Sequence, residues 1–209
     1  MRDSSKPSDA RYNEFRHIFK ASNWGPVQGR RLTLKMLPSD AVRLSVKALL
    51  AQGFRDYPKD IASTLAGEGS PWTAAAVEIG TARNWGYSFL SDILLETPIG
   101  LLMRLRSKVG QVFVMATARE LPGGLTELVV MPHPGGGDPD HTNASQPQLN
   151  AAIAQIIRQA RSVGLLVDEG TPIAYTKFTD TSCPASVGNA PRILDLNLMG
   201  EPRRRRGNR

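Results

Sequence analysis

The chain has 209 residues, of which 41% are hydrophobic and 22% are charged. This length allows one well-buried domain with flanking segments, and the composition is typical of a globular protein. The sequence contains no uninterrupted apolar run of about 18 residues, so we expect no transmembrane helix. The nearest approach, residues 93–103, is interrupted by Glu96 and Pro98.

The net charge of +7 is concentrated at the C-terminus. Five of the positive charges belong to Arg203, Arg204, Arg205, Arg206 and Arg209, which leaves about +2 for residues 1–202. So small a charge is not the electrostatic footprint expected of a protein that binds duplex nucleic acid. The arginine run itself has two interpretations: a solvated tail, or a binding element for nucleic acid, anionic lipid or an acidic partner.

The single cysteine, Cys183, excludes an internal disulfide framework and fits a reducing compartment. Residues 1–15 lack the apolar core of a secretory signal. We therefore expect a cytoplasmic protein. Cys183 is interpreted as an ordinary free thiol, because no nucleophile motif surrounds it.

Residues 1–25 are predicted to form an N-terminal extension with a short amphipathic helix over 11–21. Tyr12, Phe15, Ile18 and Phe19 fall on one face of that helix. The face either packs on the protein's own domain or docks on a partner or a membrane surface. In the docking interpretation, Phe15 and Phe19 bind the partner together with the arginines at 203–206.

Residues 26–180 are predicted to form a single α+β domain. Residues 30–36 alternate as a strand with one wet face, and a helix follows from an N-cap at Ser39 to a stop at Gly53. Residues 57–66 are ambiguous, and a second short helix is one interpretation of them. Residues 73–83 suit either a strand or a helix, residues 84–100 are not assigned, and residues 101–106 alternate as a strand that exposes arginines.

The clearest signal is a β-hairpin over residues 111–131. Two runs rich in β-branched residues flank Pro122 and Gly123, which suit the central positions of a type II turn. Both faces of residues 111–116 are apolar, so this strand is expected at the centre of a sheet covered on each side. Residues 132–139 are predicted to form a loop.

Four residues with metal-ligating side chains lie in or beside that loop: His133, Asp138, Asp140 and His141. A triple glycine in the middle provides no rigid support, so a solvated loop is favoured and no metal site is predicted. The sequence contains no established nucleophile, zinc-hydrolase or nucleotide-binding motif. We therefore assign no catalytic residue and no cofactor.

A long amphipathic helix is predicted from a capping box at Ser145 and Gln148 to Gly164. Short extended segments are expected at 165–167 and 173–178. Residues 181–209 are expected to be mostly coil. The apolar motif at 192–199 is expected to add a strand to this sheet or to a partner's sheet.

The order of these elements over residues 30–164 is similar to that of the helix-grip fold, which START-like and polyketide-cyclase-like proteins share. In that fold the last helix lies across a curved antiparallel sheet. The resemblance implies helices on one face of the sheet and an apolar cavity beneath the last helix. A solid core would use the same residues, which are Val112, Val114, Leu128, Val130, Ile153, Ile156 and Ile157.

The leading hypothesis is a non-enzymatic cytoplasmic binding or adaptor protein that holds a small hydrophobic ligand between the sheet and the C-terminal helix. The alternative is an assembly subunit that docks through its N-terminal helix and basic tail. Nucleic-acid association through the tail is a third hypothesis. An enzyme also stays open, since catalytic residues scattered on loops leave no linear trace.

Overall fold

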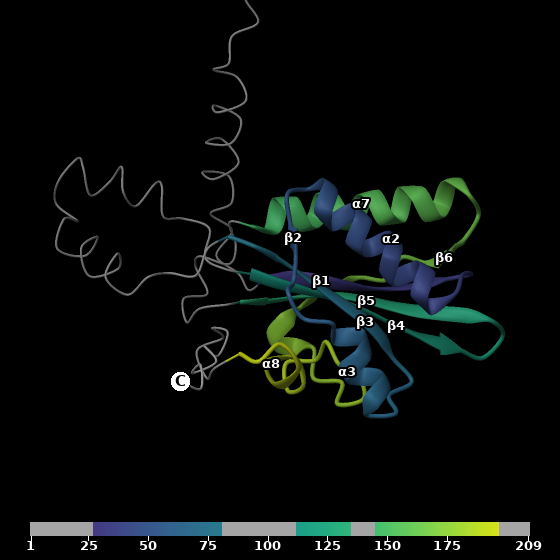
Figure 1. The fold of residues 1–209 in the computed structure, drawn as a ribbon. Helices are drawn as coiled ribbons and strands as arrows, with labels where there is room; N and C mark the ends of the chain where they lie inside the picture. The colour runs from purple at the N-terminus through teal and green to yellow at the C-terminus, as the bar shows by residue number, and fades with distance from the viewer. Residues whose placement is uncertain (1–26, 81–111, 135–144, 197–209) are drawn as a thin grey trace, which may run out of the picture.

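The computed structural model describes residues 27–80, 112–134 and 145–196 (Figure 1). Within these ranges the chain forms an open antiparallel sheet of seven strands in the order β2-β3-β4-β5-β1-β6, with β7 also paired to β1. The predicted α+β class with an antiparallel sheet is therefore confirmed. The strands are β1 (Gln28–Leu34), β2 (Arg55–Asp56), β3 (Thr73–Ile79), β4 (Val112–Leu121), β5 (Leu125–Pro134), β6 (Leu166–Asp168) and β7 (Pro172–Ala174).

The two long helices, α2 (Pro38–Ala51) and α7 (Gln146–Ser162), cover one face of the sheet, as Figure 1 shows. The opposite face is covered by α3 (Ile61–Gly67), the 3-10 helix η2 (Tyr175–Lys177), α8 (Ala190–Ile193) and the turns between them. The expectation of helices on one face thus holds for the long helices. The second cover comes largely from residues 175–196, where the sequence indicates mainly coil.

Strand β4 lies at the centre of the sheet and is buried on both faces, as its two apolar faces predict. Val112 and Val114 pack against α2 and α7 in the first hydrophobic core. Phe113 and Met115 belong to a second core beneath the short helices. The alternation of side chains along a strand divides this single apolar run between two cores.

The β4–β5 hairpin turns at the predicted position, with Gly123 at a φ of 82°, and Gly124 also has a positive φ, of 70°. The strands are longer than predicted. Pro132 and His133 lie in β5, opposite Val114 and Phe113, so the predicted loop over 132–139 begins too early. Strand β1 pairs with β5 only from Thr126 to Val130, so the missing N–H of Pro132 removes no hydrogen bond to β1.

The helix ends follow the sequence signals with one correction. Helix α2 begins at Pro38 with Leu37 as its N-cap, so the assignment of Ser39 as the cap is wrong. Proline suits the first helical position because the N–H that it lacks would have no partner in the helix. Ser145 is the N-cap of α7 as predicted, but its side chain does not make the capping hydrogen bond. Gly164, with φ of 71°, follows the end of α7.

Over its described residues, 192–196, the apolar motif does not form an added strand, and only Leu196 makes a single β-bridge. Helix α8 ends at Ile193, and Asp195 has a φ of 49°, so the chain turns sharply there. Ile193, Leu194 and Leu196 nevertheless lie buried in the second core. The segment at 173–178 is extended only as far as Ala174 and then forms η2.

Several predictions lie outside the described residues: the helix at 11–21, the elements within 84–106, and the arginine run at 203–206. The division into residues 1–25, 26–180 and 181–209 stays a prediction. Among the described residues, no helix is both long enough and apolar enough to cross a membrane.

Candidate functional site

The structure brings together all seven residues predicted to bind a ligand. They belong to one hydrophobic core between the sheet and helices α2 and α7. Val112, Val114, Leu128, Val130 and Ile156 are completely buried, and Ile153 and Ile157 are 5% and 6% exposed. The strand residues share one face of the sheet because they stand at alternate positions of two neighbouring strands.

An open groove of about 460 Å³ lies between α7 and the strands β1 and β7. Its volume falls within the usual range for small-molecule sites, roughly 300–1,000 Å³. Ile153 and Ile157 line the groove, whereas the other five predicted residues do not border it. The remaining lining residues are Gln28, Gly29, Arg30, Asn150, Ala154, Arg158, Arg161, Glu169 and Pro172.

Two hydrogen bonds fix one end of this groove. The backbone N–H of Gln28 donates to Gln146 Oε1 at 2.8 Å, and Gln146 Nε2 donates to the carbonyl oxygen of Gln28 at 3.1 Å. The start of β1 is thereby tied to the first turn of α7. Gly29, the next residue, approaches β5 so closely that an added Cβ would lie 2.2 Å from the carbonyl oxygen of Val130. The hydrogen bonds thus position the first turn of α7 against β1, and the absence of a side chain at Gly29 allows β1 to lie close to β5.

A second groove, of about 510 Å³, opens toward the opposite edge of the sheet, between α2, α3 and the start of β3. Among the residues that the structure describes, β2 pairs only with Val77 and Glu78, so the first part of β3 has no neighbouring strand on that side there. The groove lining is largely aliphatic: Val42, Val46, Leu50, Ala62, Ala74 and Ala75, with Ser39, Arg43, Lys47 and Thr73 completing it.

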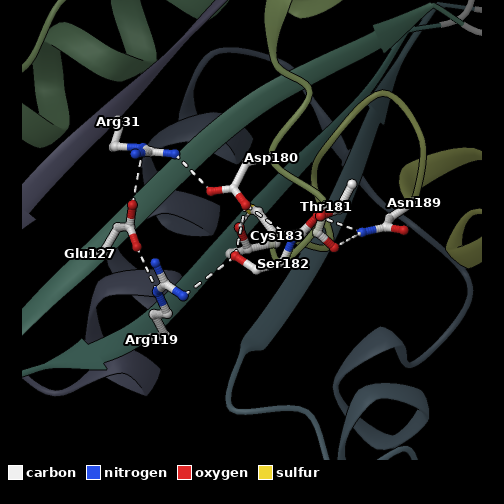
Figure 2. Close-up of polar contacts among 9 residues, drawn as sticks. Arg31, Arg119, Glu127, Asp180, Thr181, Ser182, Cys183 and Asn189 are labelled. Carbon is white, nitrogen blue, oxygen red and sulfur yellow. Dashed lines mark hydrogen bonds and ion pairs between the residues drawn. The ribbon is translucent and has the colours of Figure 1, made fainter.

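A charged cluster joins three strands to the C-terminal segment, as Figure 2 shows. Arg119 Nε donates to Glu127 Oε2 at 2.7 Å. Arg31 Nε lies 3.0 Å from Glu127 Oε1 as an ion pair whose N–H is not aligned for a hydrogen bond. Arg31 Nη2 also donates to Asp180 Oδ2 at 3.1 Å. The cluster contains two positive and two negative groups, so it carries no net charge. Its ion pairs attach residues 178–189 to the sheet through Asp180.

Two aromatic rings lie against the arginines of this charged cluster. The guanidinium of Arg31 lies 5.4 Å from the ring centroid of Phe178, and that of Arg119 lies 4.6 Å from the ring centroid of Trp72.

Hydrogen bonds from Ser182 lower the pKa of Asp180, and the nearby arginines add to the effect. Asn189 Nδ2 donates to the carbonyl oxygens of Thr181 and Cys183, which closes the loop on itself.

Cys183 is buried in the second core, and this burial raises the pKa of its thiol to about 11. Its Sγ lies 3.5 Å from the hydroxyl oxygen of Thr117. A thiol with this pKa is protonated at neutral pH, whereas the thiolate is the reactive form. The environment therefore supports the interpretation of Cys183 as an ordinary buried thiol.

His133 lies in β5 and is 4% exposed, rather than in the loop predicted from the sequence. Burial lowers the pKa of its imidazole to about 4, while a hydrogen bond to the backbone of Ala185 acts in the opposite direction. Its Nε2 has no hydrogen-bond partner among the described residues. Within residues 27–80, 112–134 and 145–196, no group of three His, Cys, Asp or Glu side chains is placed to hold a metal ion.

The sequence predicts some of the residues at these sites and gives no signal for others. It places Ile153 and Ile157 on the inner face of the long helix, and the structure confirms that position. It assigns Arg31 to the wet face of a strand, and the side chain is 41% exposed, but the sequence does not indicate its contacts with Phe178 and Asp180. Arg30 and Arg158 border the α7 groove without any motif that marks them. Their only signal is that they flank apolar positions on a strand and on a helix.

The residues predicted to bind a protein partner, Phe15 and Phe19 with the arginines at 203–206, lie outside the described residues. Their role stays a prediction. Comparison with protein-family models, curated proteins and solved structures finds no match to this chain.

Proposed function

We propose that this protein is a non-enzymatic binding protein that holds a small hydrophobic ligand between its sheet and helix α7. A cytoplasmic location is part of the proposal and rests on the single cysteine, which is buried as a free thiol. The site is the open groove at the margin of the first core rather than the centre of that core.

The observation that supports this proposal is the position of Ile153 and Ile157. Both isoleucines belong to the core and also line the groove, so an apolar group in the groove would contact the core directly. Burying apolar surface contributes about 25 cal/mol per Å², which gives a ligand a driving force without any chemical step. The centre of the core offers a ligand less space than the groove, because its side chains already pack against one another.

Titration calorimetry with 1-decanol, an uncharged ten-carbon chain, tests the proposal. Ala154 lines the groove, so Ala154→Phe fills it without removing a core side chain. Ala151 lies on the same helix but does not line the groove, so Ala151→Phe is the matched control. We expect binding that Ala154→Phe weakens at least about tenfold and that Ala151→Phe leaves within about twofold. Failure of the unmodified protein to bind decanol, or equal binding by both variants, would reject this groove as the ligand site.

A further inference from the structure

The α7 groove combines an apolar floor with a charged rim. On α7, residues 150, 153, 154, 157, 158 and 161 follow the three- and four-residue spacing of a single helix face. The aliphatic members Ile153, Ala154 and Ile157 form the floor. Asn150, Arg158 and Arg161 lie at its polar margin.

The opposite wall of the groove also carries a cation. Arg30 stands on the same face of β1 as Leu32 and Leu34, which are buried in the core beneath α7. It borders the groove at the point where that apolar face reaches the edge of the core. Cations therefore approach the groove from both the strand and the helix.

These charges are not balanced within the groove. The lining carries three arginines and one carboxylate. Arg161 Nη2 donates to Glu169 Oε2 at 2.9 Å, so this pair is neutral. Arg30 and Arg158 have no ion pair within the part of the chain that the structure describes. The groove is left with two positive charges beside an apolar floor.

We propose that the ligand is an amphiphile with an anionic head, whose apolar chain lies on Ile153 and Ile157 and whose head lies between Arg30 and Arg158. This inference rests on the proposed function and specifies its ligand class. Arginine presents a fork of N–H donors that matches the oxygens of a carboxylate or a phosphate. A cationic amphiphile would be repelled by the same residues, and a neutral one would leave both arginines without a counter-charge.

The experiment compares four ten-carbon chains by titration calorimetry on the full-length protein at low salt: decanoate, decyl phosphate, 1-decanol and decylamine. We expect decanoate or decyl phosphate to bind about tenfold more tightly than decanol, which is the effect of roughly one charge-assisted hydrogen bond. Decylamine is expected to bind more weakly than decanol. The order of the two anions shows whether the head is a carboxylate or a phosphate.

The arginines are then tested directly. Arg30→Gln/Arg158→Gln is expected to reduce the preference for the anion over decanol to less than about threefold while leaving the affinity for decanol within about twofold. Arg43→Gln, which removes an exposed arginine of α2 outside this groove, is the matched control and should keep the full preference. If the double variant does not fold, the two single variants replace it.

The outcomes separate this inference from the proposed function. Equal affinity of the unmodified protein for decanol and for both anions would overturn the anionic head and leave the hydrophobic ligand standing. If Arg30→Gln/Arg158→Gln keeps the full preference, the placement of the head between these two arginines is overturned. No binding of any of the four chains would overturn both proposals.

Discussion

Arg119 and Glu127 face each other across the β4–β5 hairpin, with Arg119 Nε 2.7 Å from Glu127 Oε2. The carboxylate is 6% exposed and also pairs with Arg31 of β1. A single glutamate on β5 thus pairs with an arginine on each of the two strands that flank it, and through Arg31 it is linked to Asp180 of the C-terminal segment. This arrangement attaches residues 178–189 to the sheet.

We predict that Glu127→Gln destabilises the protein. The substitution leaves Arg31 and Arg119 without their shared counter-charge, and breaking a buried pair costs about 3–5 kcal/mol. Since both arginines are partly exposed, we expect a smaller loss of about 1–3 kcal/mol in the free energy of unfolding. Urea titration measures it. Glu68→Gln, which breaks a solvent-exposed pair with Arg192, is the control, and an equal effect of the two substitutions would contradict the prediction.

The free energy of unfolding at acidic pH should also depend on the protonation of His133. Burial lowers the folded-state pKa to about 4, whereas an unfolded histidine has a pKa of 6.5. The unfolded chain therefore binds the proton first, so stability is complete above pH 6.5 and falls as the pH approaches 4. One pKa unit corresponds to about 1.4 kcal/mol, which gives a loss of about 3 kcal/mol across this interval.

The measurement is the urea-unfolding free energy at pH 7, 5.5 and 4.5 for the unmodified protein and for His133→Phe. The slope with pH is compared rather than the absolute stability, because the variant also loses the hydrogen bond to Ala185. A shallower slope in the variant is expected. Identical slopes would show that His133 does not titrate as its burial requires.

Cys183 should react slowly with thiol reagents in the native state. Its burial and its pKa of about 11 leave little accessible thiolate at pH 8. We expect Ellman's reagent to label the native protein at least about a hundredfold more slowly than the urea-unfolded chain, since the reaction requires the second core to open. Rapid, complete labelling of the native protein would show that residues 178–189 do not cover the sheet.

Two glycines with similar backbone conformations allow the cost of backbone strain to be measured apart from the cost of a steric clash. Gly164 and Gly170 have φ values of 71° and 56°. An added Cβ at Gly164 meets no atom within 4 Å, whereas at Gly170 it would lie 2.1 Å from the carbonyl oxygen of Arg31. Gly164→Ala should therefore cost about 1–2 kcal/mol of unfolding free energy for the left-handed backbone alone.

Gly170→Ala should cost at least about 1–3 kcal/mol more than Gly164→Ala, because the contact is with backbone that cannot rotate away. Thermal or urea unfolding of both variants provides the comparison. Equal losses in the two variants would mean that the turn after β6 can move away from β1.

The sequence predicts those parts of the fold where local signals agree. The hairpin glycines, the core face of α7 and the double burial of β4 all follow from turn chemistry and from the two periodicities of helix and strand. The second layer over the sheet does not follow from such signals. Residues 178–196 are rich in turns, and their burial depends on contacts of Cys183, Ile193 and Leu194 with distant strands.

The candidate site shows the same limit. The helix periodicity assigns Ile153 and Ile157 to the inner face of α7, but it does not indicate that they lie at its margin. That position depends on where β1 meets α7, which the hydrogen bonds between Gln28 and Gln146 determine. The pairing of Arg161 with Glu169, eight residues later, likewise depends on the turn after α7.

The most direct test of the ligand groove is a backbone-amide NMR titration of the full-length protein with 1-decanol. We predict that the largest chemical-shift changes fall on residues 150–161 of α7 and 28–30 of β1, which border the groove. Changes concentrated on residues 42–50 and 73–75, around the groove between α2 and β3, or no changes at saturating decanol, would contradict a ligand site beneath α7.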